Sequence, residues 1–295
     1  MLRLLRSEIF RLRRRWMPWV LLFFVVALTA GLYFLIYASV EAQLSALRSG
    51  QTPLGNGNPA TEAQLRQQLL LLRPAAMLQF GLGVVGGFGA IVLIVLTASV
   101  FGSEFNWGTL RVILAFGTAR ERFLGAKYAA LALYALLFTT AGAITALLSS
   151  KIVASLASLD ATLPPDLVTR LPAAILTTTF TFMPYVALAA LIAVWAKSGG
   201  AGIAIGLVVY FAEGLVTSLL VAFNRDLAGI ADYGLSRNAR AINSLYDLPS
   251  GAPNPASAGA ALPDAGHAAL TLLAYTAVFI GLALWRFRSR DLTAS

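Results

Sequence analysis

The chain has no cysteine and only one histidine, and both scarcities exclude classes of chemistry. Without cysteine it can form no disulfide, no thiolate nucleophile and no cysteine-ligated metal site. A lone imidazole is more often an interfacial residue than a ligand or a base, and we interpret His267 in this way. The HExxH and GxSxG patterns of metalloproteases and serine hydrolases are also missing. We therefore expect this chain to be no enzyme, with no catalytic residue and no metal site.

A phosphate-binding loop is missing as well. Such a loop has the pattern GxxxxGK followed by Ser or Thr, so that backbone amides wrap the phosphates. The nearest fragments, GAK at 125–127 and KSGG at 197–200, do not have this order. We expect no cofactor on this chain, and any ATP with magnesium must be bound by a separate subunit.

Charged residues make up only 12% of the chain, whereas hydrophobic residues make up 58% and the mean hydropathy is +0.77. Soluble domains are about 45 to 50% apolar, and a bilayer-spanning helix needs about 20 apolar residues. The sequence therefore predicts an all-α polytopic membrane protein whose single domain, residues 16–295, has six transmembrane helices. The expected spans are about 16–38, 77–101, 128–150, 171–195, 199–223 and 265–285.

The basic residues are concentrated on alternate segments between these spans. Fourteen of the 22 Lys and Arg residues lie on the side of the N-terminus, and eight of the 13 acidic residues lie on the other side. Because cytoplasmic loops carry the excess of Lys and Arg, both termini are expected in the cytoplasm. The outer loops are then 39–76, 151–170 and 224–264. A basic membrane face is matched by anionic membrane lipid, so we expect no nucleic-acid partner.

Residues 1–15 contain six arginines and an apolar stripe. The stripe is formed at three- and four-residue spacing by Leu2, Leu5, Ile9, Leu12 and Trp16. This pattern predicts a cytoplasmic amphipathic helix in the membrane interface. The helix either anchors the first span or also docks a partner.

Glu213 is the one formal charge inside an expected span. By helix rise it lies about 20 Å from the cytoplasmic end, slightly beyond the bilayer midplane. Burying a carboxylate there is costly unless it is paired, protonated or hydrated. Two interpretations stay open: a protonated carboxyl group with a hydrogen bond to a neighbouring helix, or a place in a water-filled pathway or interface between subunits.

Small residues and prolines predict local features of the spans. Glycines four residues apart favour close helix crossings, within the chain or between two copies. Prolines inside a span favour a kink. The residues concerned are Gly83 with Gly87, Gly202 with Gly206, and Pro172 and Pro184.

A polar break, EFNWGTLR at 104–111, lies in the expected cytoplasmic segment 102–127. Its apolar residues Trp107 and Leu110 fall at helical spacing, which predicts a short amphipathic helix on the membrane surface. Glu104 and Arg111 would be about 10 Å apart along such a helix, too far for an easy salt bridge. We expect their partners largely outside this chain, on a docked protein, although a solvated loop is the plainer interpretation.

This segment, together with the basic N-terminal helix and six spans, resembles the permease subunit of type-2 ABC transporters. Gly117, Thr118 and Ala119 stand where many members of that family have a proline. The matching positions are Glu104, Gly108, Thr109, Leu110, Arg111, Arg120 and Lys127.

The resemblance implies an ATP-driven exporter of a bacterial or archaeal inner membrane. Two permeases, identical or paralogous, would pair, and each would dock on a separate ABC ATP-binding subunit. Coupling to that subunit would fall to Glu104, Trp107, Gly108, Thr109, Leu110, Arg111 and Arg120. A stand-alone secondary carrier would instead be expected to show an internal repeat and several intramembrane charges. A non-transporting scaffold or assembly factor could share the same topology.

Overall fold

The computed structural model describes residues 2–48, 74–106, 120–159, 162–163, 165–223, 228–245 and 262–289. Within these ranges the regular secondary structure is helical, and no strand is found there. The predicted all-α class is therefore confirmed.

Six helical segments are long and apolar enough to cross a membrane, as predicted, and the chain is a multi-pass membrane protein. The fourth is formed by two consecutive helices. The segments are α2 (Trp16–Arg48), α4 (Pro74–Asn106), α6 (Arg120–Leu156), α7 (Pro165–Thr181) with α8 (Met183–Ala196), α9 (Gly199–Phe223) and α12 (Ala265–Arg288).

Several helices are longer than the apolar runs that predicted them. The first span was expected to end near residue 38 and the third to begin near 128, whereas α2 ends at Arg48 and α6 begins at Arg120. Arg, Glu, Gln and Lys are good helix formers, so a helix can continue beyond its apolar part. At 37 residues α6 is about 55 Å long, against a hydrocarbon core of about 30 Å.

The fourth span is interrupted at Phe182, which separates α7 from α8. Pro184 lies in the first turn of α8, where the missing proline N–H leaves no intrahelical bond unmade. The same proline inside a continuous helix would remove a hydrogen bond and clash with the preceding turn. A kink was predicted from both prolines; the span is interrupted two residues before Pro184, whereas Pro172 lies within α7.

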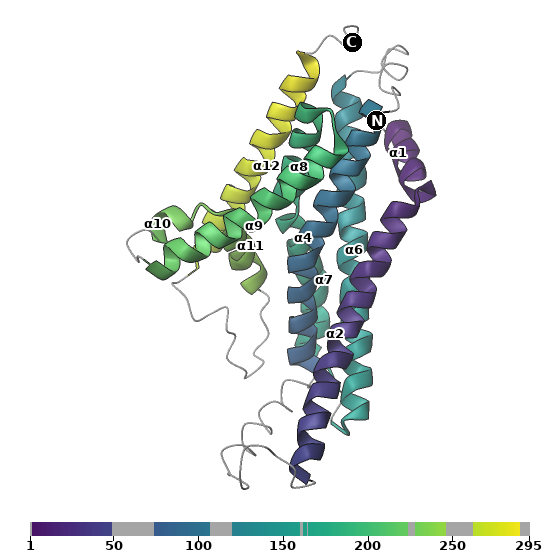
Figure 1. The fold of residues 1–295 in the computed structure, drawn as a ribbon, viewed down its shortest axis with the longest axis vertical. Helices are drawn as coiled ribbons and strands as arrows, with labels where there is room; N and C mark the ends of the chain where they lie inside the picture. The colour runs from purple at the N-terminus through teal and green to yellow at the C-terminus, as the bar shows by residue number, and fades with distance from the viewer. Residues whose placement is uncertain are drawn as a thin grey trace.

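Three shorter helices complete the described chain: α1 (Leu2–Arg14), α10 (Ala228–Ala231) and α11 (Leu235–Ser244). In Figure 1, α1 and the end of α12 lie at the top of the molecule. At the bottom, α2 and α6 extend furthest, whereas α10 and α11 lie at about mid-height. The two short helices α10 and α11 therefore lie beside the bundle and not beyond its end.

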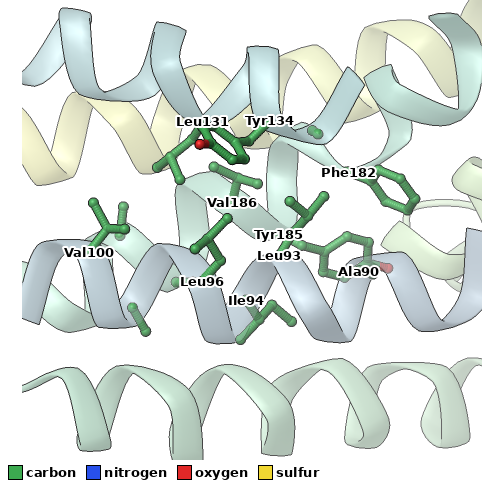
Figure 2. Packing of buried hydrophobic residues seen from close by; sticks show 14 of the residues in the cluster. Ala90, Leu93, Ile94, Leu96, Val100, Leu131, Tyr134, Phe182, Tyr185 and Val186 are labelled. Atoms are coloured by element: carbon green, nitrogen blue, oxygen red, sulfur yellow. The ribbon is translucent and has the colours of Figure 1, made fainter. Parts of the chain in front are cut away.

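The core surrounds α4, which packs against α2, α6, α8 and α9. Figure 2 shows side chains of α4, α6 and α8 interdigitating, among them Leu93, Leu131 and Val186. The apolar stripe of α1 joins this core through the buried Leu12 and the partly buried Leu5 and Ile9. This helix is thus packed on the bundle and is not simply spread on the membrane surface.

Small residues form the crossing of α4 with α9. A Cβ added to Gly202 would lie 2.8 Å from the Cβ of Ala98, and one added to Gly206 would lie 2.8 Å from Ile94. Gly202 and Gly206 therefore allow the close contact that their spacing predicted. Gly83 and Gly87 differ, because an added Cβ there meets no atom within 4 Å.

The tightest point of this crossing gives a test. A Cβ on Gly102 would lie 2.2 Å from the backbone N and Cα of Gly199, and backbone atoms cannot rotate away. We expect Gly102→Ala to destabilise the protein by about 1 to 3 kcal/mol and to lower its Tm in detergent. Gly83→Ala is the matched control and should leave the Tm unchanged or raise it slightly, because alanine is the better helix former. Equal Tm values for the two variants would contradict this crossing.

Candidate functional site

A cluster of four charged side chains lies where α1, α4 and α6 meet. Its centre is Lys127 of α6, whose residue is only 1% exposed. The Lys127 ammonium donates to the carboxylate of Glu104 on α4 and lies 3.5 Å from Oε2 of Glu8 on α1. Glu104 and Glu8 are also buried, at 4% and 3% exposure. Three helices far apart in the sequence are thus joined by one ammonium group.

Arg11 completes the cluster from α1. One of its guanidinium nitrogens lies 3.4 Å from a carboxylate oxygen of Glu8 and 3.4 Å from one of Glu104. Two cations then face two carboxylates, so the cluster as a whole carries no formal net charge. Buried charges are tolerated when they are paired and hydrogen-bonded in this way.

Aromatic rings form part of the wall around the ammonium. Lys127 Nζ lies 5.1 Å from the ring centre of Phe123 and 5.5 Å from that of Phe101. A cation over an aromatic face is attracted by the quadrupole of the ring, the more so when water is excluded. These contacts supply favourable electrostatics on the sides of Lys127 that no carboxylate occupies.

A second contact joins the start of α6 to the end of α12. Arg120 Nη1 donates to the carbonyl oxygens of Phe287 and Arg288, at 3.0 and 2.9 Å. These carbonyls belong to the last turn of α12, where a cation also complements the helix dipole. Arg288 in turn pairs with Glu121, but both side chains are exposed, so that ion pair contributes little.

A third polar site surrounds Glu213 on α9. Its carboxylate accepts from the Ser236 backbone N–H with both oxygens, at 3.1 Å each, and one oxygen also accepts from the Ser236 and Thr217 hydroxyls. Ser236 is the second residue of α11, so Glu213 satisfies a free N–H group at a helix N-terminus. Gly234 permits the approach, because a Cβ there would lie 2.8 Å from the carboxylate.

Side chains also satisfy the backbone of the turn before α11. Asn238 Nδ2 donates to the carbonyls of Asp232 and Gly234, both at 2.7 Å. Nε2 of His267 lies 3.2 Å from the Asp232 carbonyl, and its ring packs edge-on against Tyr233. His267 is therefore part of a structural contact between α12 and this turn. Nowhere among the residues with described positions do three His, Asp or Glu side chains converge as metal ligands.

The chain matches a protein family described as "protein of unknown function (DUF2705)" over residues 81–293. It belongs to that family. The matched region includes Glu104, Lys127 and Glu213, whereas Glu8 and Arg11 precede it. No curated protein matches the chain.

The structure corrects one prediction about the polar break. We expected the partners of Glu104 to lie largely outside the chain, but they are Lys127 and Arg11. The prediction was wrong because it compared positions along a single helix, whereas the partners come from two other helices. Arg120 is likewise bound within the chain, to α12. Trp107, Gly108, Thr109, Leu110 and Arg111 lie outside the described residues.

The sequence reasoning missed Glu8 as a site residue, although a signal for it was present. Glu8 is the one acid in an arginine-rich helix, and its spacing from Leu5 and Leu12 places it on the apolar face. Lys127 similarly falls between buried positions of α6 such as Phe123 and Leu131. A charged residue at an apolar position of a helix signals a buried partner.

Removing the ammonium tests the cluster. In Lys127→Met the two buried carboxylates keep only the half-exposed Arg11, and such a change typically costs about 3 to 5 kcal/mol. Lys127→Met combined with Glu104→Gln restores neutrality and should recover a large part of that loss. Thermal unfolding of the single and double variants in detergent measures the coupling. Strictly additive losses would show that the two side chains do not interact.

The Glu213 contact gives a second test. In Glu213→Ala the N-terminus of α11 loses its carboxylate acceptor, so residues 235–244 should exchange their amide hydrogens faster, by about tenfold for 1.4 kcal/mol. Hydrogen exchange with mass spectrometry reads this directly. Ser218→Ala, on the same helix but bonded only to its own backbone, is the control. Unchanged exchange in α11 of Glu213→Ala would contradict the capping role.

Proposed function

We propose that this chain is the permease subunit of an ATP-driven exporter of the type-2 ABC class. Two permeases, identical or paralogous, form the substrate pathway in the inner membrane of a bacterium or archaeon. A separate ABC subunit binds and hydrolyses ATP with magnesium, and the end of the bundle that carries α1 faces it in the cytoplasm. The support comes from the residues of the polar break, the charge asymmetry, and the way in which the bundle holds Glu104 and Arg120, on either side of the segment 107–119.

The observation that carries the proposal is that both flanks of that segment are attached to other helices. On one flank, Glu104 is held by Lys127 and by α1. On the other flank, Arg120 binds the last turn of α12. A displacement of the segment by a docked protein would therefore be passed to α1 and α12 as well as to α4 and α6. Coupling between distant sites needs such contiguous contacts.

The burial of Glu104 also indicates that the residues of the polar break have different roles. Glu104 belongs to the bundle and connects the segment to it, so it is not a group that an ATP-binding subunit would touch. Contact with that subunit falls to Trp107, Leu110 and Arg111. Buried aromatic and arginine residues are those that most often dominate the free energy of protein interfaces.

Arg111 is consequently the sharper probe of coupling. We expect the affinity-tagged chain, isolated in mild detergent from the cells that normally make it, to retain an ABC ATP-binding protein. Arg111→Ala should weaken that retention by about tenfold or more, corresponding to at least 1.4 kcal/mol. Quantitative mass spectrometry and ATPase activity of the purified fraction measure the result.

Arg122→Ala is the matched control, because Arg122 is an exposed arginine in the first turn of α6. It removes the same charge from an arginine 11 positions further along the chain and should leave retention unchanged. Two results would count against the proposal: a wild-type chain that retains no ATP-binding protein, or equal losses in the two variants. The former would favour the carrier or the scaffold.

A further inference from the structure

An apolar crevice opens where the bend between α1 and α2 lies beside α6. Its volume is about 280 Å³, and Ile9, Arg13, Trp19, Leu133, Tyr134 and Leu137 line it. In Figure 1 the three helices run along one side of the molecule, with α1 at the top. Leu133 and Leu137 are 46% and 43% exposed, one turn apart on a spanning helix, so this wall faces the acyl chains of the bilayer.

Arg13 is the charged group of this crevice. It is exposed, and it lies on α1 just before the first span begins at Trp16. The indole N–H of Trp19 donates to the Arg13 carbonyl at 2.8 Å, which fixes the bend that shapes the crevice. Arg11 is directed instead to the buried carboxylates, and Arg15 donates to Ser103 at 2.9 Å. The crevice thus combines one guanidinium, on the helix that precedes the first span, with apolar walls on a spanning helix.

We propose that this crevice binds an anionic phospholipid. The phosphate lies on the Arg13 guanidinium beside the Tyr134 hydroxyl, and one acyl chain follows Trp19, Leu133 and Leu137 into the bilayer. Guanidinium groups bind phosphate through paired, charge-assisted hydrogen bonds, and basic pockets between spanning helices at the cytoplasmic side suit anionic headgroups.

Size and charge both favour this occupant. A volume of about 280 Å³ lies just below the range of small-molecule pockets, so it holds a phosphate and the first part of one acyl chain but not a whole lipid. With six arginines and one glutamate, residues 1–15 attract an anionic lipid. A zwitterionic lipid has no net charge and is not attracted in this way. The proposal concerns the chain in its membrane and does not depend on transport.

Native mass spectrometry of the full-length protein in mild detergent tests it. The added lipids are phosphatidylglycerol and phosphatidylcholine with the same acyl chains, and a third sample receives inorganic phosphate in excess over phosphatidylglycerol. The wild-type protein should retain phosphatidylglycerol in preference to phosphatidylcholine. Inorganic phosphate should not displace the bound phosphatidylglycerol. Arg13→Gln should weaken the retention about fivefold to tenfold.

Arg14→Gln is the matched control, since Arg14 is adjacent and exposed but lies over the Phe10 ring, outside the crevice. It should weaken the retention clearly less than Arg13→Gln does, because it removes the same charge from residues 1–15 but not from the crevice. Leu137→Trp fills the crevice without changing charge, should also reduce retention, and carries the test if Arg13→Gln does not fold. The proposal is overturned by equal retention of the two lipids, by displacement with phosphate alone, or by variants in the crevice that behave like Arg14→Gln.

Discussion

Lys127 is buried in an apolar bundle, and the need to compensate its charge restricts what can pack around it. Only an anion compensates a buried cation, and the nearest carboxylates come from two other helices, through Glu104 and Glu8. The positions of α1, α4 and α6 relative to one another are therefore specified by charge. Alanine and leucine contacts alone would tolerate a shift of one helix along another. A buried ion pair does not tolerate such a shift, because a buried charge left without its partner strongly destabilises the fold.

The same principle applies to the irregular backbone beside α9. A turn between two helices leaves backbone N–H and C=O groups without helical partners, and side chains satisfy them here. Glu213 accepts from the start of α11, and Asn238 donates to the turn before it. The carboxylate in the fifth span therefore has a structural partner. This supports the first of its two interpretations, a hydrogen bond to a neighbouring helix.

Composition and periodicity were enough to predict the six spans, the amphipathic N-terminal helix and a kink near Pro184, because each depends on residues close together in the sequence. Which helices face one another depends on distant residues, and no local pattern encodes it. For this reason the sequence led us to expect partners of Glu104 outside the chain, although Lys127 was already among the residues singled out. The contrast between Gly202, which packs closely against α4, and Gly83, where an added Cβ meets no atom within 4 Å, has the same origin. The spacing of glycines indicates a helix face of small residues but not which helix packs on it.

The position of α1 links the two sites on which the proposals rest. On one side, Arg11 contacts Glu104, which lies three residues before the segment 107–119 begins, and Glu8 contacts Lys127. On another side, Arg13 and Ile9 line the crevice. A lipid in the crevice and a protein on the segment would then act on the same helix. If the lipid and the protein each favour one position of α1, their binding free energies are coupled. Such coupling is reciprocal: a bound lipid would change the affinity for the protein by the same factor as the bound protein changes the affinity for the lipid.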